Sequence, residues 1–486
     1  MHNLDPGYRQ KAKQSFCQKR REYWNRVVQK YDRSGRLGAC YQRLLAGYCQ
    51  SLIPPDSHIL ELGCGCGELL AALKPARGVG IDFSVEAIHR ARSRHPGLMF
   101  LIADAHELPI NTQFDVIILS DLVNDLWDVQ KVIEELQPLC HSRTRVILNS
   151  YNNLWRIPLS IAKRLDLGAL LLEQNWLAPH DIINLLKLSG FEVIKRWPRT
   201  LLPFQLSFLS AFANRYLVNI IPFSWFALTN MFVARPILEG SMQNRSRDTD
   251  VSIIIPARNE AGNIDAIIRR TPELGRHTEL IFVEGHSKDD TYAAIEQGIK
   301  QYSGRQMKLY RQTGQGKGDA VRLGFEKAEG KILMILDADM TVPPEDLERF
   351  FDALTSGKGE FINGVRLVYP LEDRAMKFMN MIGNKLFSLA FSWLLDQPIK
   401  DTLCGTKVLW KRDYQAIAKN RHYFGDFDPF GDFDLLFGAA KLNLKIIELP
   451  IRYRSRRYGD TNIARWRHGW LLLKMVIFAA RRIKFI

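Results

Sequence analysis

The sequence predicts an α/β protein with two consecutive domains, each built around a doubly wound sheet. Two observations support this prediction. The chain has 486 residues, which is more than one ordinary hydrophobic core accommodates. Short apolar runs alternate with helical patterns in two separate series, and a polar stretch at 241–249 divides the two series as a linker.

The first domain is expected at residues 1–240. Residues 8–53 carry amphipathic helical patterns that end at Pro54 and Pro55. A βαβ rhythm follows, with strands predicted at 58–62, 78–82, 98–103, 115–119, 144–149, 191–197 and 227–234.

One apolar stretch in this domain approaches the length that spans a membrane. Tyr216–Ala234 has no charged residue, but Asn219, Pro222 and Asn230 interrupt it. We interpret it as buried core, with a helix at 208–221 and a strand at 226–234. A membrane-spanning helix is the alternative.

The second domain is expected at residues 250–486. Strands are predicted at 251–255, 279–283, 307–310 and 331–336, followed by a helical stretch at 373–395, a mixed region to 450 and an amphipathic helix from about 462.

Composition indicates a globular protein with anionic partners. The chain is 46% hydrophobic and 24% charged, with a formal net charge of +15. Such a charge favours nucleic acid, a phospholipid surface or phosphorylated substrates. Seven scattered cysteines show no zinc-site spacing, and their odd number argues against a disulfide framework. The polar N-terminus lacks an apolar signal core, so we expect a cytoplasmic protein.

A glycine-rich turn follows the first predicted strand. Gly63, Gly65 and Gly67 let the backbone turn sharply and approach a ligand closely, beside the start of a helix. Asp82 ends the next strand, where a carboxylate can accept hydrogen bonds from ribose hydroxyls, and Asp104 ends the third. The alternative is that both aspartates only cap loops.

These segments resemble class I S-adenosylmethionine-dependent methyltransferases over residues 40–235. The matching segments are Glu61–Gly67, Gly80–Asp82, Ala103–Ala105 and Phe114–Ser120. The resemblance implies that Glu61 and the three glycines hold the methionine part of S-adenosylmethionine, Asp82 the ribose and Asp104 the adenine. The acceptor is not identified. Asp121 and His106 are candidates for a general base or for structural loop residues.

A second buried run, Ile332–Leu336, ends in two carboxylates one residue apart, Asp337 and Asp339. Carboxylates at this spacing on a strand end can share a hard cation such as Mg²⁺ or Mn²⁺. The cation in turn neutralises a diphosphate leaving group.

The surrounding segments resemble family 2 glycosyltransferases of Rossmann-like, GT-A type over residues 250–460, especially dolichyl- or polyprenyl-phosphate hexose transferases. The matching segments are Val251–Glu260, Leu280–Asp290, Gly314–Gly318 and Pro343–Pro344. The resemblance implies a metal at Asp339 and Asp337, and donor or phosphate contacts from Pro256, Ala257, Glu260, Glu284, Lys317, Asp337 and Arg456. Glu284 stands where the family usually has an aspartate pair, so the donor nucleobase stays open.

An inverting displacement onto a sugar hydroxyl needs a base, whereas a phosphate acceptor is already nucleophilic. Asp401 is the first candidate for that base by position, and Asp432 and Asp434 compete with it. Helix capping or support of the metal ligands is the alternative role for all three.

The sequence therefore predicts a bifunctional enzyme that binds S-adenosylmethionine, a nucleotide sugar and a polyprenyl-phosphate or glycan acceptor. The rivals are a glycosyltransferase with a non-catalytic methyltransferase-like module, and a basic nucleic-acid-binding protein. We expect no nucleic-acid partner, because an RNA-binding signature is missing and the acidic pair would stay unexplained. Bases and tryptophans flank an apolar run within 465–482, which predicts peripheral contact with the inner face of the cell membrane. A helix packed on the core is the alternative.

Overall fold

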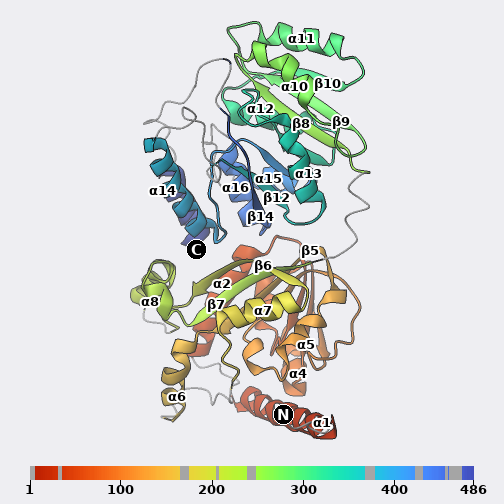
Figure 1. Cartoon of the computed structure of the whole chain (residues 1–486). Helices are drawn as coiled ribbons and strands as arrows, with labels where there is room; N and C mark the ends of the chain where they lie inside the picture. The colour runs from red at the N-terminus through yellow and green to blue at the C-terminus, as the bar shows by residue number, and fades with distance from the viewer. Residues whose placement is uncertain are drawn as a thin grey trace. The chain divides into compact units, whose positions relative to one another are not determined.

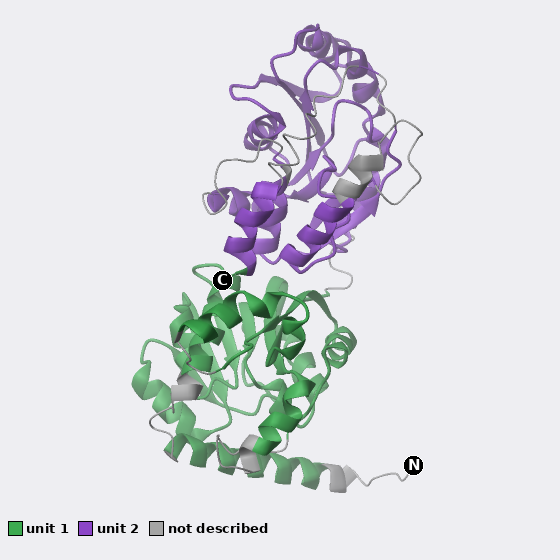
Figure 2. Ribbon diagram, turned by 90° about the vertical axis from the view of Figure 1, so that its left-hand side faces the viewer, with its two compact units in different colours: residues 1–237, 485–486 green, residues 238–484 purple. Residues whose placement is uncertain are grey.

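The computed structural model describes residues 6–30, 36–164, 174–203, 207–237, 248–366, 378–421, 431–454, 458 and 473–485. The chain divides into two compact units, which are residues 1–237 with 485–486 and residues 238–484 (Figure 2). Each unit is built around a mixed sheet of seven strands, which confirms the predicted α/β class (Figure 1). Residues 241–247 of the predicted linker lie outside the described residues.

The sheet of unit 1 has the order β3-β2-β1-β4-β5-β7-β6. Strands β1 to β5 are parallel, and β7 runs antiparallel between β5 and β6. The strands are β1 (His58–Leu62), β2 (Arg77–Asp82), β3 (Met99–Ile102), β4 (Phe114–Leu119), β5 (Cys140–Tyr151), β6 (Phe191–Arg199) and β7 (Thr229–Pro236). All seven predicted strands are confirmed, with shifted ends.

Helices cover both faces of this sheet because its parallel strands are apolar on both sides. Apolar side chains of α2, α3 and α4 pack on one face, and those of α5 and α7 pack on the other. The helices are α1 (Pro6–Lys30), α2 (Arg36–Leu52), α3 (Glu68–Leu73), α4 (Val85–Arg94), α5 (Val129–Glu134), α6 (Arg156–Arg164), α7 (Pro179–Leu188) and α8 (Ser207–Arg215).

The apolar stretch Tyr216–Ala234 is only partly the buried core that its sequence predicts. The strand is confirmed as β7 and is buried throughout. The helix is shorter than expected: α8 ends at Arg215, and two 3-10 turns, η4 (Leu217–Asn219) and η5 (Phe223–Phe226), follow it. Residues 220–226 are mostly exposed, since Pro222 and the short turns keep them off the sheet. No helix among the described residues is long and apolar enough to cross a membrane.

The sheet of unit 2 has the order β10-β9-β8-β11-β13-β12-β14, with β13 antiparallel to both of its neighbours. The strands are β8 (Val251–Ala257), β9 (Thr278–Glu284), β10 (Gln306–Arg311), β11 (Ile332–Ile335), β12 (Phe361–Val365), β13 (Lys407–Trp410) and β14 (Ile446–Pro450). The four predicted strands are confirmed. The region expected to be mixed supplies β13 and β14, and β12 precedes the helical stretch; the sequence pattern did not separate these three strands.

The helices of unit 2 are α10 (Ile264–Arg270), α11 (Thr291–Gln301), α12 (Lys317–Lys327), α13 (Leu347–Thr355), α14 (Phe378–Leu395), α15 (Lys411–Lys419) and α16 (Asp432–Lys441). The predicted helix at 373–395 corresponds to α14, and its first residues lie outside the described ones. For the C-terminal helix predicted from about 462, only the end is described, as helix from 473 to 479 and a π-helix, η9 (Ala480–Lys484).

We expect Phe232→Ala to lower the free energy of unfolding of unit 1 by about 3–5 kcal/mol, because truncating a buried aromatic side chain leaves a cavity. Phe232 lies in β7 and has no exposed surface. Chemical denaturation checks this, with Ile183→Ala on the exposed side of α7 as the matched control. Equal losses in the two variants would contradict the packing described here.

Candidate active sites

The first candidate site lies where the strand order of unit 1 reverses. Chain connections from β1 lead toward β2 and β3, whereas those from β4 lead toward β5. Such a reversal opens a crevice at the carboxyl ends of the strands, where ligands of doubly wound sheets bind. The glycine turn follows β1 and Asp121 follows β4, so both border this crevice.

The three glycines of the turn are needed for different physical reasons. Gly63, Gly65 and Gly67 all adopt positive φ angles, of 70°, 50° and 78°. A Cβ added to Gly67 would collide with Phe100, so this glycine serves packing. A Cβ added to Gly65 would meet nothing within 4 Å. Open space beside a left-handed backbone is what the close approach of a ligand requires.

Two buried carboxylates support the turn from below. Asp82 accepts hydrogen bonds from the Gly65 and Ser84 amides at 2.9 and 2.8 Å. Glu61 accepts one from the Leu70 amide at 3.1 Å. Burial raises the pKa of Asp82 despite its amide donors, and it raises the pKa of Glu61 well above the ordinary value. These two carboxylates therefore lie beneath the turn and accept hydrogen bonds from backbone amides.

Asp104 and His106 form a local pair after β3. The Asp104 carboxylate lies 2.6 Å from His106 Nδ1 and accepts the His106 amide at 3.0 Å. Burial would raise the pKa of Asp104, but these hydrogen bonds lower it to about 2. His106 Nε2 accepts the Asp128 amide at 3.2 Å. Both ring nitrogens of His106 are engaged, which favours the structural role over that of a base.

Asp121 anchors a polar cluster that the sequence does not reveal. It has a φ angle of 53°, and its carboxylate accepts hydrogen bonds from Tyr41 at 2.8 Å and Asn149 at 2.6 Å. Burial raises its pKa, while the hydrogen bonds from Tyr41, Asn149 and Tyr151 oppose that rise. Tyr41 comes from α2 and Asn149 from β5, so only the fold brings them together.

Helix α1 lies across the loops of this crevice. The Asp125 carboxylate accepts hydrogen bonds from Arg20 Nε and Trp24 Nε1, both at 2.7 Å. Ser84 Oγ donates to Asn25 Oδ1 at 2.6 Å. Ser84 follows β2 and Asp125 lies after β4, so α1 bridges two loops at the carboxyl edge of the sheet. The sequence predicts this helix but not its position.

The second candidate site lies at the equivalent reversal in unit 2, between β8 and β11. Pro256 and Ala257 end β8, and Asp337 and Asp339 follow β11. Lys317, the first residue of α12, forms an ion pair with Asp337 at 2.5 Å. The crevice therefore brings together the predicted nucleoside-side residues and one member of the acidic pair.

Three cations surround Asp337. Burial alone would raise its pKa, but Lys317, Lys407 and Arg366 hold the pKa below its ordinary value. Lys407 is fully buried and donates a hydrogen bond to the Cys404 carbonyl. A Cβ on Gly405 would collide with Asp337 and Lys317, so this close packing requires glycine.

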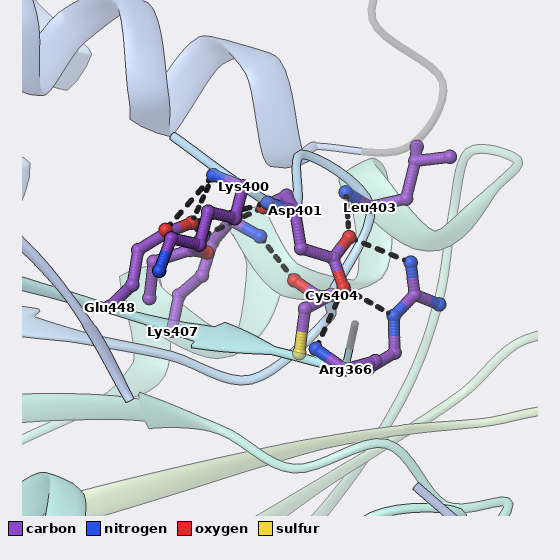
Figure 3. A network of polar contacts seen from close by, with 8 residues as sticks. Arg366, Lys400, Asp401, Leu403, Cys404, Lys407 and Glu448 are labelled. Atoms are coloured by element: carbon purple, nitrogen blue, oxygen red, sulfur yellow. Dashed lines mark hydrogen bonds and ion pairs between the residues drawn. The ribbon is translucent and has the colours of Figure 1, made fainter. Parts of the chain in front are cut away.

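Asp401 is committed to one of these cations. Its carboxylate receives Arg366 Nε and Nη2 at 2.7 and 2.8 Å, as well as the Arg366 and Leu403 amides (Figure 3). Arg366 lowers the pKa of Asp401 although burial opposes the change. The Glu448 carboxylate accepts the Lys400 and Asp401 amides and fixes this loop. A carboxylate held by two guanidinium bonds is poorly placed to take a proton, so the geometry favours a positioning role for Asp401.

Asp339 Oδ1 accepts hydrogen bonds from the Thr341 amide at 3.1 Å and the Thr341 hydroxyl at 2.7 Å. Within the described part of the chain, no group of three or more His, Cys, Asp or Glu side chains could hold a metal ion. A cation between Asp337 and Asp339 would therefore take further oxygen ligands from a bound diphosphate. Two hard carboxylates at a crevice fit that demand.

The other predicted donor contacts lie around the end of β8 and β9. Glu260 is buried and accepts a hydrogen bond from Asn263 Nδ2 at 2.7 Å. Glu284 is buried at the end of β9 and accepts the Ser287 amide. Both carboxylates thus shape the loops that follow β8 and β9.

Three predicted residues remain, and the structure describes the side chain of one of them, Asp434. Asp434 lies 3.3 Å from Arg421 Nε and 3.8 Å from Arg322 Nη1, which suits a structural ion-pair network. Asp432 is the first residue of α16, and its side chain lies outside the described residues, as does Arg456. Arg366 and Tyr453 are residues that sequence reasoning missed; Arg366 lies 5.3 Å from the centre of the Tyr453 ring. No motif surrounds either one in the sequence.

Both halves of the chain match known families. Residues 53–186 match the family described as a methyltransferase domain, and residues 252–417 match glycosyl transferase family 2. The chain therefore carries a methyltransferase domain followed by a family 2 glycosyltransferase domain.

Relatives of the second half include glycosyltransferase AglJ of Haloferax volcanii, 27% identical over 46% of this chain and 69% of the relative. The dolichol-phosphate mannosyltransferase of Pyrococcus furiosus is 31% identical over 44% of this chain and 59% of the relative. A solved structure of an S-adenosylmethionine-dependent methyltransferase from Thermotoga maritima is 16% identical, covers 45% of this chain and 99% of its own, and has a TM-score of 0.36.

We expect Asp401→Asn to lower the free energy of unfolding at neutral pH by about 3–5 kcal/mol, because it leaves the Arg366 guanidinium buried without its anion. The pKa of Asp401 is lowered in the folded state, so the pair stabilises above the unfolded pKa of about 4. That contribution is lost as the pH falls through the folded pKa. Denaturant titrations from pH 7 to pH 3 should show the difference between wild type and variant shrinking, and a constant difference would contradict this.

Proposed function

We propose that the chain is a bifunctional transferase, because each domain carries a donor motif in the crevice of its own sheet. The N-terminal domain, residues 1–240, would transfer a methyl group from S-adenosylmethionine to a small-molecule or glycan acceptor. The C-terminal domain, residues 250–486, would transfer a hexosyl group from a nucleotide sugar. The match of the two halves to a methyltransferase domain and to family 2 glycosyltransferases is the observation that carries this proposal.

In the first site, Gly65 would admit the donor to close backbone contact, and Asp82 would accept the ribose hydroxyls. Glu61 would face the methionine part and Asp104 the adenine. The open space at Gly65 and the buried carboxylates below the turn support these roles. A sulfonium donor is cationic, and an acidic site favours its binding.

We expect Asp82→Asn to weaken S-adenosylmethionine binding at least about tenfold in titration calorimetry, because an acceptor of the ribose hydroxyls and a support of the Gly65 amide are both weakened. The matched control is Glu134→Gln on the exposed side of α5. Equal affinities would remove the assignment. Binding without methyl transfer to any extract acceptor would favour the non-catalytic module.

In the second site, Pro256, Ala257, Glu260 and Glu284 would line the nucleoside pocket, and Lys317 would face the diphosphate. A divalent cation at Asp337 and Asp339 would neutralise the leaving diphosphate.

A phosphate acceptor fits this site better than a sugar hydroxyl. Lys317 forms an ion pair with Asp337, and Lys407 and Arg366 also lower the pKa of that carboxyl, so cationic groups lie at the crevice where phosphates would bind. A phosphate oxygen is already nucleophilic, and the reaction then needs no base. The engaged carboxylate of Asp401 supports this view. The similarity to a dolichol-phosphate mannosyltransferase supports a polyprenyl-phosphate acceptor.

Such an acceptor lies in a membrane, and unit 2 exposes apolar side chains on two helices. Leu386 and Leu389 of α14 are 63% and 59% exposed, and Ile477 of the C-terminal helix is 48% exposed. These side chains support peripheral contact with the inner face of the cell membrane, which would place the protein at the cytoplasmic side.

We expect Asp339→Asn to keep the fold and to reduce sugar transfer at least about a hundredfold, because the metal loses a carboxylate beside the diphosphate. Donor turnover in the presence of Mg²⁺ or Mn²⁺ is the measurement, with Asp352→Asn on the exposed side of α13 as the control. Full activity of Asp339→Asn, or of the wild type in excess chelator, would exclude metal-dependent transfer.

A further inference from the structure

Helix α8 is amphipathic in the reverse sense of an ordinary surface helix. Its outward side chains are apolar: Phe208 is 77% exposed, Leu209 66% and Phe212 42%. Its inward side chains include Ser210 and Asn214, which are 7% and 4% exposed. A surface helix of a globular protein normally turns its apolar side to the core. Here the apolar side faces outward, which suits contact with an apolar surface outside the domain.

The inward polar side is firmly held. Asn214 Oδ1 accepts the Leu201 and Leu202 amides at 2.7 and 2.8 Å, and its amide group donates to the Leu202 carbonyl at 2.7 Å. Asn219 Oδ1 accepts a hydrogen bond from the buried Arg199 at 3.0 Å. These bonds fix the orientation of α8, because rolling it over would break a buried polar network.

The exposed apolar surface continues beyond α8. In residues 220–226, Ile221 is 70% exposed, Trp225 61% and Phe226 57%. In α6, Ile157 is 70% exposed and Ile161 51%. We call the outward surface of α6, α8 and residues 220–226 the apolar face.

Hydrogen bonds join the parts of the apolar face. Asn152 Nδ2 donates to the Trp225 carbonyl and Trp155 Nε1 donates to the Phe226 carbonyl, both at 2.9 Å. The 3-10 turn η4 packs against both α8 and η5. All three parts belong to unit 1, and Figure 1 shows α6 and α8 on the same side of it. The apolar face is therefore one surface rather than scattered side chains, and surfaces of this kind mark interaction sites.

The charges around the apolar face indicate which kind of partner binds it. Residues 150–165 and 200–237 contain no Asp or Glu, whereas Arg156 and Arg215 are exposed. Aromatic and aliphatic side chains bordered by arginines match the interface of an anionic lipid bilayer. A second copy of the chain is a poorer fit, because two-fold pairing would bring the arginines together, and the described residues of the apolar face include no acid.

The position of the apolar face links it to the methyl-transfer site. Tyr151, Thr229 and Arg199 are paired across β5, β7 and β6, and they mark the carboxyl edge of the sheet. Residues 152–164 leave this edge after Tyr151, and residues 200–228 connect Arg199 to Thr229. Tyr151 also reaches Asp121 beside the first crevice. The surface thus adjoins the half of the edge that the donor motif does not occupy.

We propose that the apolar face docks the methyltransferase unit on an anionic lipid surface and presents its crevice to a membrane-bound methyl acceptor. Docking is independent of the proposed enzymatic function. Only the assignment of a membrane-bound methyl acceptor rests on that proposed function.

Hydrogen exchange of the full-length wild-type protein, with and without vesicles, tests docking without any variant. We expect slower exchange in peptides covering 150–164 and 207–228 when phosphatidylglycerol vesicles are present, and little change with phosphatidylcholine alone. A peptide covering 180–188 of α7 is the internal control. If vesicles bind but the two peptides exchange as before, the proposal is overturned, and contact through unit 2 explains the binding.

Vesicle affinity of variants gives the second test. Phe208→Ser/Ile221→Ser/Trp225→Ser should weaken binding to phosphatidylglycerol vesicles by roughly tenfold or more, because three apolar groups no longer enter the interface. The control Ile183→Ser/Leu188→Ser removes exposed apolar groups of α7 and should bind as the wild type does. Protection of the face that grows with protein concentration in the absence of vesicles would overturn the proposal in favour of a second copy. Calorimetry in vesicle-free buffer measures S-adenosylmethionine binding, so it tests the proposed function independently of docking.

Discussion

The reversal of strand order beside β1 and beside β8 is the constraint on which both candidate sites depend. Parallel strands need crossover connections, and a reversal sends neighbouring connections to opposite faces of the sheet. The carboxyl ends at that point are left uncovered, and their loops are free to carry ligand-binding groups. The glycine turn after β1 and the acidic pair after β11 both occupy such a position. The same architecture therefore supports two different chemistries in one chain, because the sites lie in the loops rather than in the strands.

Electrostatics distinguishes the two crevices. In unit 1, Glu61 and Asp82 are buried and Asp121 is half-buried, all beside amide or hydroxyl donors, and desolvation raises their pKa values. In unit 2, Lys317, Lys407 and Arg366 surround Asp337 and lower its pKa. A bound cationic sulfonium would favour the charged form of the unit 1 carboxylates, and the cationic groups of unit 2 suit a diphosphate. The charges of the two expected donors thus agree with the residues around each motif. No single motif contains all of those residues.

Both units expose apolar side chains on helices. Unit 1 presents the apolar face of α6, α8 and residues 220–226, and unit 2 presents leucines of α14. On α8 and the following turn η4, polar side chains face the domain, held by buried hydrogen bonds of Asn214 and Asn219. This inversion is specific, since an ordinary surface helix would lose stability by it. A lipid surface, as proposed, would resolve the inversion, and the proposed polyprenyl-phosphate acceptor would lie in the same phase.

The sequence by itself determined the two α/β sheets, the parallel strands and the donor motifs, because hydrophobic periodicity and glycine turns are local properties. It did not determine β12, β13 and β14, which lie between 361 and 450, where helical and extended patterns are mixed. The sequence pattern also did not identify Arg366, because the partner of that residue, Asp401, lies 35 positions away in the chain. Only the tertiary structure brought Tyr41 and Asn149 onto Asp121, laid α1 across the first crevice and turned the polar side of α8 inward. Those features depend on contacts between distant segments, which packing decides and local pattern does not encode.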